Sequence, residues 1–264
     1  MLEIDGALGE GGGQILRTSL ALSMCLAKPF KIVNIRATRK NPGLRPQHLA
    51  AVNAAAEISH AGVEGAVQGS QQLIFHPHGI FPGHYDLSIG TAGSTTLVLQ
   101  TVLPTLMLAD APSYLNLEGG THNPMAPPFD FLEQAFLPLI NRMGPTVTTT
   151  LERPGFFPKG GGRFRINIKP IARLKPIHLL ERGKVRHQRV EILLAHLPEH
   201  IAQRERTVIT EGLNLADDCL TIQIHDSAIG PGNVVSVIVQ SENITEVFTG
   251  FGERGIPTGR SGRR

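Results

Sequence analysis

Tryptophan is absent from the 264 residues, and aromatic side chains account for only 5% of the chain. Hydrophobic residues make up 41%, so the apolar interior must be built mainly from Leu, Ile, Val and Ala. A chain of this length can form one large domain or two smaller ones, each with its own hydrophobic core.

Cysteine is nearly absent as well. The two cysteines, Cys25 and Cys219, lie far apart in the sequence and predict neither a disulfide framework nor a metal site. The eleven histidines include no helical pair with a carboxylate between its members, so the sequence does not predict a zinc-binding site. This cysteine usage predicts a reducing, cytoplasmic setting.

Long hydrophobic runs are also missing. No apolar run approaches 18 residues, and the candidate stretch 97–108 is interrupted by Gln100 and Pro104, among others. The sequence therefore predicts no membrane span. The N-terminal segment is acidic and lacks a basic region followed by an apolar one, which predicts no secretory signal.

Charge is nearly balanced, because 25 basic and 22 acidic residues give a net charge of +3. Basic side chains nevertheless gather in two segments, one with Arg36, Arg39, Lys40 and Arg45, the other with Lys159, Arg163 and Arg165. Clusters of this kind suit a phosphate-bearing ligand, and they also occur on ordinary solvated surfaces.

The sequence contains an internal repeat. A shift of 82 positions places Gly11 on Gly93, Ser19 on Thr101, Ile35 on Leu117 and Asn41-Pro42 on Asn123-Pro124. Each copy reads as a glycine-rich turn, a helix, a strand, an Asn-Pro loop, a second helix and closing strands. Two such copies predict an α+β fold whose units pack together, because about 80 residues bury little apolar surface alone.

The periodicity also predicts where the elements lie. Helices are expected at 14–27, 47–61, 94–109 and 128–143, and strands at 30–36, 113–118, 147–151 and 164–168. Gly69-Ser70 between apolar stretches predicts a tight hairpin with strands at 65–68 and 71–76.

The pattern changes after Pro170, where the glycine turn is missing and a single helix accompanies the strands. We therefore expect a large repeat domain at 1–180, with units at about 1–82 and 83–170, and a small α/β domain at 181–252. Residues 253–264 are polar and rich in Gly and Arg, which predicts a disordered tail.

The glycine turn is the first candidate site. The segment Gly9-Glu10-Gly11-Gly12-Gly13-Gln14 precedes a helix, where free backbone N–H groups bind anions. It lacks the Lys-Ser/Thr of a Walker A loop and the spacing of a dinucleotide fingerprint, so a purely structural turn is an equal alternative. Glu10 is a candidate metal or hydroxyl contact.

Polar residues elsewhere add to this candidate. Arg36 and Arg39 follow a strand and can hold phosphate if the glycine turn lies nearby. Gln100 sits in an apolar helix and must be paired or face a pocket. His48, at a helix start, and His122, in a Gly/Pro-rich loop, are the histidines nearest these motifs.

Several motifs in order resemble the RNA 3'-terminal phosphate cyclase family over residues 1 to about 255. They are Gly6-Ala7-Leu8-Gly9-Glu10-Gly11-Gly12-Gly13-Gln14-Ile15-Leu16-Arg17, Ile35-Arg36-Ala37-x-Arg39-x-x-Pro42-Gly43-Leu44 with Gln47-His48-Leu49, Gly93-Ser94-x-x-Leu97-Val98-Leu99-Gln100-Thr101, Gly119-Gly120-Thr121 with Ala126-Pro127-Pro128, and Gly155-Phe156-x-Pro158-x-Gly160-Gly161-Gly162. The resemblance implies tandem units of two helices on a four-stranded sheet, plus a small inserted α/β domain.

The resemblance also implies the reaction. An ATP-dependent enzyme of this family converts an RNA 3'-phosphate into a 2',3'-cyclic phosphodiester through enzyme–AMP and RNA-adenylate intermediates, with Mg²⁺ or Mn²⁺ offsetting charge. Its partners would be ATP and RNA with a 3'-terminal phosphate. Carried over by position, the ATP contacts are Gln100, Glu10, Arg36, Arg39 and Pro127, the RNA or phosphate contacts are Arg17, Arg45 and His48, and the metal contact is Glu10.

One departure concerns the nucleophile, which in the family is a histidine in a further repeat after the inserted domain. No histidine follows His225 in this chain, so we assign no catalytic nucleophile and expect a truncated, inactive member that forms no AMP adduct. Two alternatives stay open: a non-catalytic RNA-binding relative in ribosomal RNA maturation, and an enolpyruvyl transferase with a related repeat architecture.

Overall fold

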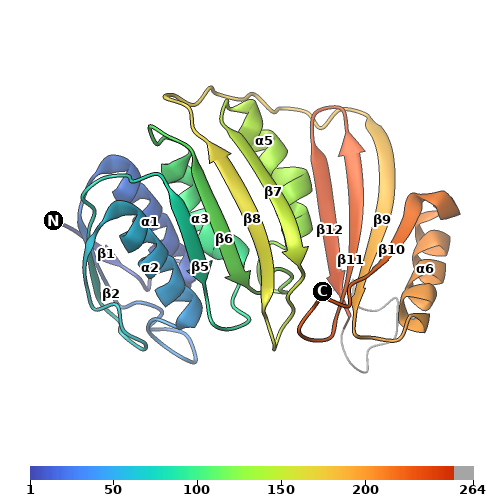
Figure 1. Ribbon diagram of the computed structural model, residues 1–264, viewed down its shortest axis with the longest axis horizontal. Helices are drawn as coiled ribbons and strands as arrows, with labels where there is room; N and C mark the ends of the chain where they lie inside the picture. Colours follow the sequence, from blue (N-terminus) through green and yellow to red (C-terminus); the bar gives the residue numbers. More distant parts are fainter. Residues whose placement is uncertain (253–264) are drawn as a thin grey trace.

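The computed structural model describes residues 1–252, which form three four-stranded sheets. The sheets follow one another along the long axis of the molecule, with the third at the end away from the N-terminus (Figure 1). The predicted disordered tail, residues 253–264, lies outside the described residues.

The first repeated unit places two helices with one sheet. Its elements are β1 (Leu2–Asp5), α1 (Gly13–Leu26), β2 (Phe30–Val33), α2 (Pro46–Ser59), β3 (Gly62–Glu64) and β4 (Leu73–His76). The strand order is β1-β2-β4-β3, with β1 parallel to β2 and the other neighbours antiparallel.

The second unit repeats this topology. Its elements are β5 (His84–Ser88), α3 (Thr95–Leu106), β6 (Ser113–Gly119), a second helix in three parts (α4, Phe129–Phe131; η1, Leu132–Phe136; α5, Leu137–Arg142), β7 (Thr146–Arg153) and β8 (Gly162–Lys169). The order is β5-β6-β8-β7, again with the first two strands parallel. The predicted fold class, tandem units of two helices on a four-stranded sheet, is therefore confirmed.

The second helix of this unit is less regular than predicted. Its middle turn is π-helical, and the N–H of Leu137 bonds to the carbonyl of Leu132 rather than to the residue one position nearer. Pro138 follows directly and has no N–H to donate. A proline inside the helix therefore coincides with a widened turn instead of a break.

The third sheet has a different topology. It consists of β9 (Val185–Ala195), β10 (Leu220–Ile224), β11 (Gly232–Ser241) and β12 (Thr245–Phe251), with α6 (His200–Leu213) connecting β9 to the parallel β10. The order β10-β9-β11-β12 differs from that of the repeats, so this sheet is not another copy. The sequence analysis did not anticipate β12.

The predicted hairpin around Gly69-Ser70 is wrong. β3 ends at Glu64 and β4 begins at Leu73, so strand structure is absent from residues 65–72 of the described chain. The N–H of Gly69 instead donates to the carbonyl of Leu44, and the N–H of Leu44 donates to the carbonyl of Ser70. The backbone of Gly69 and Ser70 is therefore hydrogen-bonded to the loop before α2 and does not form a tight turn between two strands.

Both repeated units contribute to one hydrophobic core. Helix α3 contacts α1 and α2, and buried side chains from all three helices and both sheets form a single cluster. Leu16, Leu20, Val52, Val98 and Val102 are all fully or almost fully buried there. Apolar burial across the unit boundary therefore brings the first turns of these helices together. Within residues 1–252, no helix has the length and apolar character needed to cross a bilayer.

A buried carboxyl in the third-sheet region gives a first prediction. Glu205 on α6 accepts a hydrogen bond from Asn233 Nδ2 at 2.8 Å, while Glu205 Oε2 and Asn233 Oδ1 are buried without partners among the described residues. Burial raises the pKa of Glu205 above its ordinary value, although Asn233 and Arg204 oppose the shift. The folded state therefore binds this proton more tightly, and stability falls as pH rises above the ordinary pKa.

We expect Glu205→Gln to raise the free energy of unfolding by about 1 kcal/mol at pH 7, with a smaller gain at pH 4. Urea denaturation at both pH values measures this difference. Glu211→Gln, an exposed change on the same helix, should alter neither value. A gain that is equal at pH 4 and pH 7 would contradict the explanation.

Candidate functional site

A cavity of about 730 Å³ lies where α1 and α2 begin. Its walls come from the glycine turn, the first turns of these two helices and the loop after β2, with Leu97 and Met125 added from the second unit. The volume is in the range of small-molecule sites, and the lining is rich in cations and free backbone N–H groups.

The glycine turn supplies the floor of this cavity. Gly9 and Gly11 have φ values of 62° and 56°, a left-handed conformation that glycine adopts readily. Gly12 is the N-cap of α1 and provides no side-chain cap, so the first N–H groups of the helix are left for another acceptor. A Cβ on Gly13 would lie 2.4 Å from His48 Nε2, so only glycine fits there.

Two arginines on the loop after β2 border the cavity. Arg36 has a φ of 54°, and its guanidinium donates to the carbonyl oxygens of Asn41 (2.7 Å) and Gly43 (2.9 Å). Arg39 lies 3.6 Å from the exposed carboxylate of Glu10. Burial and then the charges of neighbouring arginines lower the pKa of Arg36, a sign of mutual repulsion within the cluster. Arg36 therefore shapes the loop, while Arg39 is the more available cation.

Arg17 connects α1 with α3. Its Nε donates to Gln100 Oε1 at 3.2 Å, and burial lowers the pKa of its guanidinium. Arg17 lines the cavity, whereas Gln100 is an exposed residue outside its lining. The predicted nucleotide contact at Gln100 is thus adjacent to the cavity and reaches it through Arg17.

His48 is the buried polar group of this site. Its Nδ1 accepts a hydrogen bond from the N–H of Arg45 at 3.1 Å. Burial, followed by the charges of Arg36, Arg17 and Arg45, lowers the pKa of His48 to about 4. The imidazole is therefore neutral at pH 7, with its proton on Nε2.

The structure thus brings most of the predicted residues together. Five of them line the cavity: Glu10, Arg17, Arg36, Arg39 and His48. Arg45 acts on His48 from the start of α2, and Pro127 receives a hydrogen bond from Thr96 at 2.7 Å without lining the cavity. Gln47 was missed, although it lines the cavity and accepts from the N–H of Ser94 at 2.8 Å. Its position beside His48 at a helix start was the available signal.

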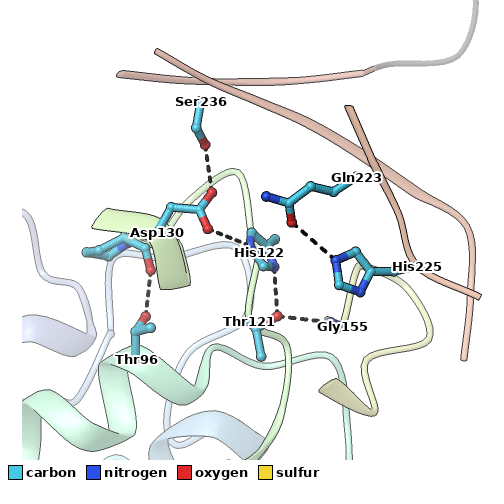
Figure 2. A network of polar contacts seen from close by, with 9 residues as sticks. Thr96, Thr121, His122, Asp130, Gly155, Gln223, His225 and Ser236 are labelled. Atoms are coloured by element: carbon cyan, nitrogen blue, oxygen red, sulfur yellow. Dashed lines mark hydrogen bonds and ion pairs between the residues drawn. The ribbon is translucent and has the colours of Figure 1, made fainter. Parts of the chain in front are cut away.

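A second polar network joins the second unit to the third sheet (Figure 2). The Asp130 carboxylate accepts from Ser236 Oγ at 2.6 Å and lies 3.5 Å from His122 Nε2. The N–H of Gly155 donates to Thr121 Oγ1 at 2.9 Å, and Thr121 Oγ1 shares a hydrogen bond with His122 Nδ1 at 2.8 Å. Thr121, His122, Asp130 and Ser236 thus form one continuous chain of polar contacts across the boundary.

The electrostatics of this network favour a charged carboxylate. Burial by itself raises the pKa of Asp130, but the hydrogen bonds and charge of His122 and the hydrogen bond of Ser236 outweigh it, and the net shift is downward. Asp130 therefore stabilises the fold above its ordinary pKa and loses this contribution as the pH falls through the lower folded value.

We expect Ser236→Ala to lower the free energy of unfolding by about 2 kcal/mol at pH 7, because it removes a hydrogen bond to a buried charge. The loss should shrink at pH 3, and urea denaturation at the two pH values measures it. Ser241→Ala is the matched control, since the buried Ser241 hydroxyl has no partner among the described residues. Equal losses in the two variants would refute this role.

Most of the sequence matches a known protein family. The RNA 3'-terminal phosphate cyclase family matches residues 8–249. The chain belongs to this family. An RNA 3'-terminal phosphate cyclase of Koribacter versatilis is 54% identical over 256 residues, which cover 97% of this chain and 72% of the relative. One of Ralstonia nicotianae is 51% identical over 257 residues, covering 97% and 74%.

Among the residues that line the cavity in the described chain, Glu10 is the one carboxylate that could contact a metal ion. Among residues 1–252, no group of three or more His, Cys, Asp or Glu side chains could hold an ion. Glu10 is exposed and faces Arg39. A single carboxylate fits Mg²⁺ or Mn²⁺ only if substrate phosphates and water complete the coordination.

The cluster of positive charges around the cavity predicts an unusual pKa for His48. The His48 resonances in an NMR titration should show a midpoint near pH 4, below the ordinary 6.5. Arg17→Met should raise that midpoint, because it removes a neighbouring positive charge. Arg165→Met, on the outer face of β8, should leave it unchanged. A midpoint near 6.5 in the unaltered chain would contradict the burial and charge of His48.

Proposed function

We propose that this chain is an ATP-dependent RNA 3'-terminal phosphate cyclase whose cavity binds the phosphates of ATP and of the RNA 3' end. One observation carries the proposal: the uncapped start of α1, three guanidiniums and a neutral imidazole N–H converge on a single cavity. Backbone amides and arginines are the groups that proteins use for polyphosphates.

Each residue has a proposed task. The N–H groups after Gly12 hold one phosphate, and Arg39 and Arg17 form charge-assisted hydrogen bonds with others. His48 donates from Nε2 without adding charge. Burial and the neighbouring arginines, Arg45 among them, keep His48 neutral. Arg45 also adds positive potential for RNA, while Gln100 orients Arg17. Arg36 holds the loop that carries Arg39, and its remaining N–H groups face the phosphates.

Two further predicted contacts have weaker geometric support. Pro127 belongs to the segment that carries the cavity residue Met125, and we propose that this segment borders the nucleotide. Glu10 is the proposed single protein ligand of Mg²⁺ or Mn²⁺, an ion that would offset the negative charge of the phosphates.

The proposed chemistry has three steps. A histidine nitrogen attacks the α-phosphorus of ATP and expels pyrophosphate; the RNA 3'-phosphate then takes AMP from that nitrogen; finally the 2'-hydroxyl attacks the 3'-phosphorus and expels AMP. We assign the nucleophile to no described histidine. His48 Nε2 lies against Gly13, which suits a positioned donor better than an attacking group.

Other parts of the interpretation are proposals of the same kind. We divide the chain into a repeat domain at 1–180 and a small domain at 181–252, and the free thiols of Cys25 and Cys219 favour a cytoplasmic setting. A non-catalytic RNA-binding role remains the alternative function, and RNA binding without ATP binding would favour it. The family match sets the enolpyruvyl-transferase interpretation aside.

The proposal predicts the effect of one charge. Arg39→Ala should weaken ATP binding by about tenfold or more, because it removes a cation from the phosphate site without disturbing the buried core. Isothermal titration calorimetry with Mg-ATP measures this change. Arg173→Ala, an exposed change away from the cavity, is the control. ATP binding that is absent from the unaltered chain, or unaffected by Arg39→Ala, would contradict the proposal.

A further inference from the structure

Two consecutive phenylalanines between β7 and β8 have opposite environments. In the 154–161 loop, Phe156 is 5% exposed and Phe157 is 73% exposed. A phenylalanine ring this exposed is available to stack on a flat partner.

The backbone on each side of Phe157 is fixed. The ring of Phe156 packs with Leu193 and Val234 of the third sheet, so tightly that a Cβ on Gly232 would lie 2.0 Å from it. The carbonyl of Phe156 accepts from the N–H of Gly160 at 2.7 Å. Phe157 is therefore presented to solvent from a rigid support, which lowers the entropic cost of stacking on it.

The loop is also joined to the wall of the cavity. Gly155 accepts from the N–H groups of Thr121 (2.9 Å) and His122 (3.1 Å). These residues belong to the 120–128 loop, which carries Met125, a cavity residue that is 93% exposed. Both loops lie at the edge where β5 and β6 end (Figure 1), since Gly119 of β6 pairs with Gly162 of β8.

A cation, Lys159, follows the exposed ring two positions later in the same loop. The aliphatic stem of Lys159 covers Gly230, where a Cβ would come within 2.6 Å of Lys159 Cγ. Within the described part of the chain, its ammonium group makes no ion pair, unlike Arg163, whose neighbours are Glu118 and Glu152. The loop thus offers a flat apolar face together with an unpaired positive charge.

We propose that the 154–161 loop binds the single-stranded RNA body behind its 3'-phosphate: Phe157 stacks on a nucleobase and Lys159 contacts a backbone phosphate. Single-stranded RNA is recognised through aromatic stacking combined with cations along the backbone, and these are the two groups the loop presents. This inference rests on the proposed function, because the cavity holds the RNA end that brings the upstream nucleotides over the loop.

The stacking role is tested with fluorescence anisotropy on a labelled oligoribonucleotide that carries a 3'-phosphate. Phe157→Ala should weaken RNA binding by about tenfold, while Phe157→Trp should retain it. Phe248→Ala, which removes another exposed ring from β12, should have no effect and is the matched control. Calorimetry with ATP should give the same affinity for all of these variants.

Two further measurements separate stacking from a general loss of structure. A mononucleoside 3'-phosphate is too short to reach the loop, so Phe157→Ala should leave its affinity unchanged. Lys159→Ala should reduce the slope of log affinity against log salt concentration by about 0.7, the value for one phosphate contact on a single strand.

The outcomes distinguish the two claims. RNA affinity that is equal in Phe157→Ala and the unaltered chain overturns the inference and leaves the proposed function standing. Equal losses for the oligonucleotide and the mononucleoside phosphate also overturn it. A chain that binds neither ATP nor the 3'-phosphorylated RNA overturns the proposed function and this inference together.

Discussion

The close approach of Gly13 to His48 is the contact on which the cavity depends. It joins the first turn of α1 to the first turn of α2, and there is no room for a side chain between them. Because α3 packs against both helices, the second unit completes the same site. Burial of shared apolar surface thus places the free N-terminus of α1 beside Arg36 and Arg39 of the loop after β2.

The positively charged side chains around the cavity repel one another. The pKa values of Arg36 and His48 are both lowered, in each case first by burial and then by neighbouring cations. An unbalanced positive cavity of this kind is costly without a ligand and gains from an anion. Keeping His48 neutral limits the repulsion while retaining an N–H donor, so the site can receive several phosphate oxygens.

The third sheet is tied to the repeats by polar and apolar contacts together. Asp130 reaches Ser236 across the boundary, and Phe156 inserts into the cluster formed by β9 and β11. Asp130 follows the 120–128 loop, which carries the cavity residue Met125, and Phe156 lies in the 154–161 loop, which is hydrogen-bonded to it through Gly155. The position of the third sheet is therefore coupled to the shape of the cavity edge, and the exposed Phe157 depends on the same anchoring.

Sequence periodicity by itself determined the repeat, the α+β class and the glycine turn before α1, because local hydrophobic spacing and backbone chemistry are written in neighbouring residues. The family resemblance singled out Arg17, Arg39 and His48. Only the tertiary structure decided that Gln100 bonds to Arg17 outside the cavity lining and that Gln47 lines the cavity. It also replaced the hairpin at Gly69-Ser70 by pairing with the loop at Leu44. Those outcomes depend on long-range packing, in which distant segments compete for the same backbone hydrogen bonds, and no local pattern records that competition.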